Sequence, residues 1–289
     1  MKVKSFSISS KRYPNEDKMA IQNMGIYGIA IVLADGMGGL SLGDLAADVV
    51  TNTVADYLMK NYEGYAEKEV LHKALERADQ EVRRVSIEKK SNMGAAVAVA
   101  IIIDYELYCT WQGNVRIYAQ HEGKTELLTT DHMANIGYGR TALTRCIKGS
   151  GLRDDVPFLY HKLSEDDTVF VCTDGLYKVA EKNLGVLSAD EISRKLNDPE
   201  DDASLIEVLL NRKNGCHTKF LSITKTILDF IIEKLKRLLN SIVSLEDIFD
   251  RARIPILLIY DFSVLIISFS LIFENRFLGR LLSKDKLFN

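Results

Sequence analysis

The chain has 289 residues, and 47% of them are apolar, which is enough for a substantial core and excludes a disordered protein. Its net charge of -3 is uneven: residues 1–210 hold 24 basic and 32 acidic side chains, whereas residues 211–289 hold 13 and 8. The acidic body argues against nucleic acid as a partner and suits a cation site. The cysteines show no CxxC spacing and the amino terminus has no apolar signal core, so we expect reduced thiols in a cytoplasmic protein.

The first part of the chain predicts strands. Residues 2–9 alternate imperfectly between polar and apolar, and residues 19–22 with 26–34 predict a hairpin. Between them, Arg12 precedes the adjacent carboxylates Glu16 and Asp17 in a polar segment. Such a segment is also typical of an ordinary charged loop with a local ion pair.

The hairpin leads into Asp35-Gly36-Met37-Gly38-Gly39. A carboxylate at the end of a buried strand, next to bare glycine backbone, suits a hard cation such as Mg2+ or Mn2+. Asp and Gly are also the commonest residues of a strand-to-helix turn. This stretch alone therefore leaves a metal site and an ordinary turn equally open.

Two amphipathic helices are predicted next, one capped by Ser41 and running to about Lys60, the other over residues 66–89. The composition then changes. Residues 95–103 are continuously apolar, and 107–111, 115–120 and 125–129 predict further strands. Two helices followed by an antiparallel meander indicate a layered α/β sandwich rather than βαβ alternation.

The last part of the body repeats the earlier strand-to-glycine pattern. After a glycine-rich, charged loop over residues 137–155, residues 168–173 predict a buried strand that ends in Asp174-Gly175. A short helix over 190–196, an acidic run over 198–202 and a closing strand over 203–210 follow. Taken alone, the acidic run is more typical of a solvated loop.

The order of these motifs resembles the metal-dependent serine/threonine protein phosphatases of the type 2C (PPM) family, bacterial branch. The likeness spans residues 1–210 and implies an α+β fold, a four-layer α-β-β-α sandwich of two mainly antiparallel sheets flanked by helices. The motifs that carry it are Arg12-x-x-x-Glu16-Asp17, Ala34-Asp35-Gly36-Met37-Gly38-Gly39, Met93-Gly94, Gly113-Asn114-Val115-Arg116, Leu128-Thr129-Thr130-Asp131-His132, Leu143-Thr144-Arg145, Cys172-Thr173-Asp174-Gly175-Leu176 and Asp201-Asp202-Ala203-Ser204.

The resemblance implies a centre of two Mn2+ or Mg2+ ions. Asp35 would bridge the ions, the carbonyl of Gly36 would bind one of them, and Asp174 and Asp201 would bind the other. Two divalent ions lower the pKa of a water enough to make it the nucleophile, so no Ser or Cys nucleophile is required.

The same resemblance assigns roles around that centre. Glu16, with Asp17 beside it, would belong to the metal site and orient the metal-bound water. Arg12 would grip the substrate phosphate by charge-assisted hydrogen bonds and offset the charge of the transition state. The implied substrates are phosphorylated proteins, in opposition to a serine/threonine kinase.

Two positions depart from the family pattern. Asn114 stands where bacterial members carry an acid that helps to hold an additional ion, so a third ion should bind more weakly here. Met37 stands where eukaryotic members carry a histidine that is thought to act as the general acid. The leaving group must therefore receive its proton from water or from another group.

Two other functions remain open at this stage. One is a phosphatase-like recognition module that has lost catalysis. The other is a hydrolase of small phosphoesters on the same fold. Turnover of para-nitrophenyl phosphate and a comparison of phosphopeptide with sugar phosphate would distinguish them.

Residues 211–289 lie outside the resemblance and form a basic, apolar tail. Residues 219–240 predict a basic amphipathic helix, and residues 254–273 form an apolar stretch interrupted by Pro255 and Asp261. We expect the tail, through residues 219–273, to meet a membrane surface or a protein partner and to make a cytoplasmic protein membrane-associated. A helical appendage packed on the body and a single membrane span are the alternatives.

Overall fold

The computed structural model describes residues 1–11, 14–37, 42–153 and 155–210. Contacts divide the chain into two compact units, Met1–Asn214 and Gly215–Asn289, and every described residue belongs to the first. The predictions for Arg12 and for the tail therefore lie outside the described residues. Within those residues, no helix is long and apolar enough to cross a membrane.

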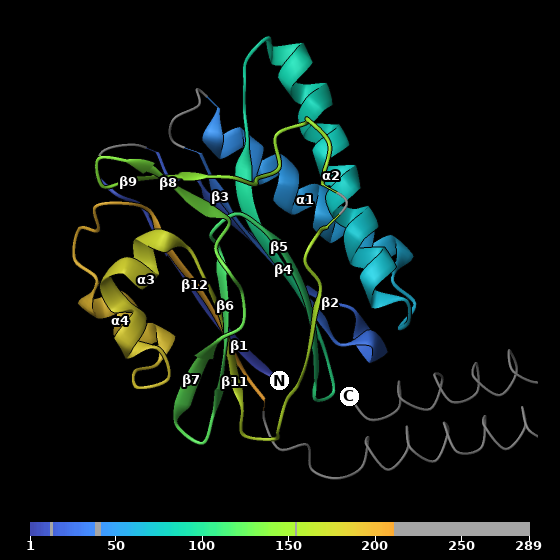
Figure 1. The fold of residues 1–289 in the computed structure, drawn as a ribbon. Helices are drawn as coiled ribbons and strands as arrows, with labels where there is room; N and C mark the ends of the chain where they lie inside the picture. The colour runs from blue at the N-terminus through green and yellow to red at the C-terminus, as the bar shows by residue number, and fades with distance from the viewer. Residues whose placement is uncertain (12–13, 38–41, 154, 211–289) are drawn as a thin grey trace, which may run out of the picture. The chain divides into compact units, whose positions relative to one another are not determined.

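Two five-stranded antiparallel sheets form the centre of the unit (Figure 1). The first has the order β1 (Lys2–Ile8), β12 (Ala203–Leu209), β11 (Thr168–Cys172), β6 (Arg116–His121), β7 (Lys124–Leu127). The second has the order β10 (Leu159–Lys162), β5 (Glu106–Gln112), β4 (Ala95–Ile103), β3 (Ile29–Gly36), β2 (Asp17–Asn23). A separate hairpin pairs β8 (Met133–Gly137) with β9 (Arg140–Leu143).

The continuous apolar run of β3 arises because both of its faces are covered. Side chains alternate across a strand. Ile29, Ile31 and Leu33 pack in the core between the two sheets, against Val169 and Val171 of β11. The intervening Ala30, Val32 and Ala34 pack instead under helices α1 (Gly43–Asn61) and α2 (Glu67–Lys89).

The other face of the first sheet carries the second helical layer. Leu176 of α3 (Asp174–Ala180) and Ile192 of α4 (Ala189–Lys195) pack against Phe170 and Leu205. Figure 1 shows α1 and α2 on one side of the sheets and α3 and α4 on the other. The predicted four-layer α-β-β-α sandwich is therefore confirmed. Two short 3-10 turns, Gly25–Tyr27 and Glu181–Asn183, complete the elements of the described residues.

Some local predictions differ from the structure. The residue at the cap of α1 is Leu42, not Ser41, which lies outside the described residues. The hairpin β8–β9 extends into the stretch expected to be a loop, and it has little apolar alternation because most of its residues are exposed. Asp174 begins a helix of seven residues, too short to show a helical period in the sequence.

Candidate functional site

Asp17 and Asp35 lie side by side on neighbouring strands. Asp17 begins β2, Asp35 lies at the end of β3, and the two are direct partners in the antiparallel register. Asp17 is buried and Asp35 is partly exposed. The structure thus joins two of the predicted site residues at one edge of the second sheet.

Asp174 and Asp201 belong to the first sheet. Asp174 follows β11 as the first residue of α3, and Asp201 lies just before β12, the neighbour of β11. Gly175 is required between them, because a Cβ atom there would lie 2.2 Å from the Asp202 carbonyl oxygen. The close approach of these two backbones places the carboxylates of the first sheet together.

The four carboxylates form one electrostatic cluster. Burial raises the pKa of Asp35 well above its ordinary value, and the charges of Asp17, Asp174 and Asp201 raise it further. Burial, with smaller effects of the Asp202 and Asp174 charges, also raises the pKa of Asp17 to about 8. Burial and Asp174 raise the pKa of Asp201. Carboxylates of two different sheets therefore act on one another.

Glu16 is positioned by Asp202, a residue that the sequence analysis did not select. The carboxylate of Asp202 accepts hydrogen bonds from the backbone N–H of Ser10 and of Glu16, each at 2.7 Å. Burial raises the pKa of Glu16, and Asp202 raises it further. The sequence signal for this role was the adjacent pair Asp201-Asp202. Asp201 interacts with the carboxylate cluster, and Asp202 binds the backbone of the segment before β2.

Glycine is also required where Glu16 meets the end of β3. A Cβ atom on Gly36 would lie 2.3 Å from the carbonyl oxygen of Gly43, the first residue of α1. A Cβ atom on Gly43 would lie 2.7 Å from the carboxylate of Glu16. Gly36 thus allows β3 and α1 to approach closely, and Gly43 leaves room for the Glu16 carboxylate.

Thr173 links the two sheets through Asp17. Its fully buried hydroxyl donates to Asp17 Oδ2 at 2.8 Å and accepts from the backbone N–H of Ser204 at 3.0 Å. Thr173 precedes Asp174 in the motif, so its position was visible in the sequence while its role was not. It fixes one oxygen of Asp17 relative to the first sheet.

Asp174 has two protein donors. Its Oδ2 atom accepts from Asn114 Nδ2 at 3.0 Å and from Lys178 Nζ at 2.8 Å. Burial lowers the pKa of Lys178, but the hydrogen bond to Asp174 and the nearby carboxylates raise it by more. The pKa of Lys178 is therefore above its ordinary value. Asn114 is buried, and its Oδ1 atom has no hydrogen-bond partner in the described structure.

Two further family motifs, those that contain Arg116 and Asp131, support α3. Arg116 binds both carboxylate oxygens of Asp131, at 3.0 and 2.8 Å, and also binds Glu181 at 3.0 Å. Its guanidinium carbon lies 3.7 Å from the centre of the Tyr177 ring. Paired, bidentate contacts of this kind are geometrically specific. The motif residues Arg116 and Asp131 therefore hold the helix that carries Asp174.

The donor chemistry of the cluster fits a divalent cation. Carboxylates and a backbone carbonyl are the hard oxygen donors that Mg2+ and Mn2+ prefer. In the part of the chain that the structure describes, no three acidic, His or Cys side chains are arranged to ligate a single ion. Oxygens of Asp17 and Asp174 instead accept hydrogen bonds from Thr173, Asn114 and Lys178.

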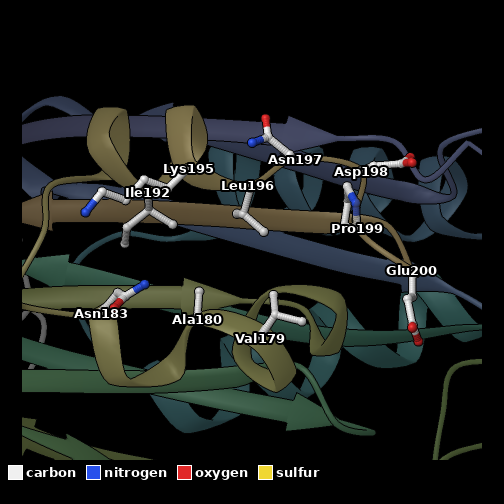
Figure 2. A pocket seen from close by; sticks show the side chains of 10 residues that line it. All are labelled: Val179, Ala180, Asn183, Ile192, Lys195, Leu196, Asn197, Asp198, Pro199 and Glu200. Atoms are coloured by element: carbon white, nitrogen blue, oxygen red, sulfur yellow. The ribbon is translucent and has the colours of Figure 1, made fainter.

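A surface hollow of about 300 Å3 lies beside this cluster without containing it. Figure 2 shows its lining by Val179 and Ala180 of α3, by Ile192 of α4 and by the segment that ends at Glu200. None of the clustered carboxylates lines it. Its position next to Asp201 makes it a neighbour of the site and not the site itself.

The comparisons with known proteins agree with this geometry. The family profile described as protein phosphatase 2C matches residues 7–212. A candidate protein phosphatase of Mycoplasma genitalium is 24% identical, with 56% of this chain and 75% of that protein covered.

Solved structures have the same fold. The S. agalactiae serine/threonine phosphatase superposes with a TM-score of 0.64 at 17% identity and covers 73% of this chain and 99% of that chain. The catalytic domain of the serine/threonine phosphatase PstP, solved with two manganese ions, has a TM-score of 0.61 at 19% identity. The match covers 73% of this chain and 98% of that chain. The chain belongs to the protein phosphatase 2C family and is a metal-dependent protein serine/threonine phosphatase.

Proposed function

We propose that this protein hydrolyses phosphoserine and phosphothreonine with two Mn2+ or Mg2+ ions held by Asp35, the carbonyl of Gly36, Asp174 and Asp201. The observation that carries the proposal is the gathering of acidic side chains from two sheets into one cluster with raised pKa values. Such a cluster is costly without cations, because like charges close together disfavour ionisation. The two manganese ions of the PstP structure support the number of ions.

When bound, the ions supply the positive charge that activates a water for attack on phosphorus and stabilises the leaving oxygen. Glu16 and Asp17 act as acceptors that orient this water. Asp202 fixes the backbone of Glu16, and Thr173 fixes one oxygen of Asp17. Arg12, four residues before Glu16 in the chain, binds the phosphate oxygens and offsets their charge.

The substrates proposed are phosphorylated proteins that a serine/threonine kinase produces. The test is hydrolysis of a phosphothreonine peptide and of a sugar phosphate by the purified chain with added Mn2+ or Mg2+, and with EDTA. We expect metal-dependent release of phosphate from the peptide and much slower release from the sugar phosphate. Full activity in excess EDTA, or a preference for the sugar phosphate, would contradict the proposal.

A further inference from the structure

The Oδ2 atom of Asp174 is occupied by two donors of the protein itself. Lys178 lies four residues after Asp174 on α3, a spacing that places both side chains on one face of a helix. Its ammonium and the Asn114 amide both point hydrogens at this one oxygen, at 2.8 and 3.0 Å. Asp174 is only 15% exposed, so the lysine supplies a charge where water contributes little.

Asn114 and Lys178 both suit an Asp174 carboxylate that has no ion on this side. A carboxylate at position 114 would meet Asp174 as a like charge and would need a cation between the two. An amide donates to Asp174 directly and needs none. With Asn at position 114 and Lys at position 178, one side of Asp174 is neutralised without any ion.

We propose that Lys178 is a built-in cation that competes with divalent metal for Asp174 and, together with Asn114, closes this side of the carboxylate to an additional ion. The inference rests on the proposed function, in which Asp174 is a metal ligand. It assigns to Lys178 the role of a positioning residue that acts through Asp174 and sets the metal affinity of the site. The lysine side chain is 58% exposed, so it can turn toward solvent when an ion takes the Oδ2 atom.

The first test measures the Kd of Mn2+ by titration calorimetry for the parent and three variants of the full chain. Lys178→Met removes the charge, Lys178→Arg keeps it, and Lys182→Met removes a charge from an exposed lysine one turn further along. We expect Lys178→Met to bind Mn2+ about tenfold more tightly, because a unit charge no longer competes for the carboxylate. Lys178→Arg and Lys182→Met should stay within about twofold of the parent.

The second test counts bound Mn2+ at millimolar concentration in Asn114→Asp, Lys178→Met and the double variant. Of these three variants, we expect only the double variant to bind one more ion per chain than the parent. The melting temperature of the metal-free Lys178→Met protein should fall relative to that of Lys182→Met, since Asp174 then lacks its counter-charge, and Mn2+ should restore it.

These measurements separate the inference from the proposed function. A parent that binds no Mn2+ would overturn the metal site itself. A parent that binds Mn2+, with equal Kd values for Lys178→Met and Lys182→Met, would overturn only the role of Lys178. An additional ion in Asn114→Asp alone would show that Lys178 does not close the site.

Discussion

Asp17 and Asp35 occupy the same register position of the β2–β3 ladder, so two carboxylates are held beside each other by backbone pairing. Folding therefore brings together two carboxylates, each of which disfavours ionisation of the other when no cation is present. This relationship predicts opposite effects of one substitution on activity and on stability.

Asp35→Asn should lower activity roughly a hundredfold or more, because the charge that ions contribute to phosphoryl transfer is worth several kcal/mol. The same variant should melt at a higher temperature than the parent when both are free of metal, since a neutral amide replaces a carboxylate whose ionisation is disfavoured by burial and by neighbouring carboxylates. Phosphatase assays and calorimetric melting check both effects. Asp48→Asn, on the exposed face of α1, is the matched control and should change neither.

The stability of the metal-free protein should fall as the pH rises. Asp17 has a folded-state pKa of about 8, above its ordinary value of 3.8, so the folded state holds its proton more tightly than the unfolded state. The stability contributed by that proton is complete below the unfolded pKa and is lost progressively as the pH rises toward and through about 8. Melting temperatures between pH 5 and pH 9 should therefore decline in EDTA.

Mn2+ should flatten this decline, because a cation favours the ionised carboxylates that the metal-free protein disfavours. Melting curves with and without Mn2+ should separate most at the alkaline end. A metal-free protein that is most stable at pH 9 would show that the carboxylates are not desolvated as the structure indicates.

Thr173→Val should destabilise the fold by about 1–3 kcal/mol, because it removes the hydroxyl that pairs with Asp17 and leaves the backbone N–H of Ser204 without its acceptor. Valine has nearly the same shape, so packing changes little. Thr173→Ser keeps the hydroxyl and should recover most of the stability. Denaturant unfolding measures the difference, and a Thr173→Val protein as stable as the parent would contradict the role of the hydroxyl.

Arg12→Ala should raise KM for a phosphopeptide about tenfold or more, because charge-assisted contacts to the phosphate are lost. Its neighbour Lys11 provides the control. Lys11 pairs with Asp198 at the surface, and exposed pairs contribute little to stability. Lys11→Ala should therefore leave KM nearly unchanged. An equal rise in KM for both variants would show that Arg12 contributes only a nonspecific positive charge.

The tail should place the protein at a membrane surface or on a partner. Cell fractions of the full chain should release it with high salt or carbonate if residues 219–273 lie at an interface. Extraction by detergent alone would indicate a true membrane span. Recovery entirely in the soluble fraction, without a bound protein, would contradict the prediction.

The central elements were predictable because their signals are long. The apolar run over β3 and the helical period of α2 each extend over enough residues to define an element, and both were confirmed. The buried face of α1 was less predictable, because part of it consists of small side chains. Ala47, Thr51 and Ala55 are buried in this helix and give only a weak apolar signal in the sequence.

The sequence allowed the residues of the candidate site to be selected, but it did not reveal which side chains contact one another there. Asp35 and Asp174 stood out at strand ends followed by glycine, whereas Asp17 and Asp201 were selected through the family resemblance. The structure brings the four carboxylates into one electrostatic cluster. Lys178, Thr173 and Asp202 were missed because each depends on a partner far away in the sequence or on the first turn of α3, which has no period of its own. Only the folded chain shows that an ordinary-looking lysine faces Asp174.

The two halves of the cluster come from different sheets, with Asp17 and Asp35 on the second and Asp174 and Asp201 at strand ends of the first. Under the proposed function, loading the site with metal is therefore equivalent to fastening the sandwich with a reversible cross-link between residues 35 and 174. The ions would bind the folded arrangement and not the unfolded chain, so they would stabilise the fold by mass action. Fluctuation between the sheets would then depend on the supply of metal in the cell.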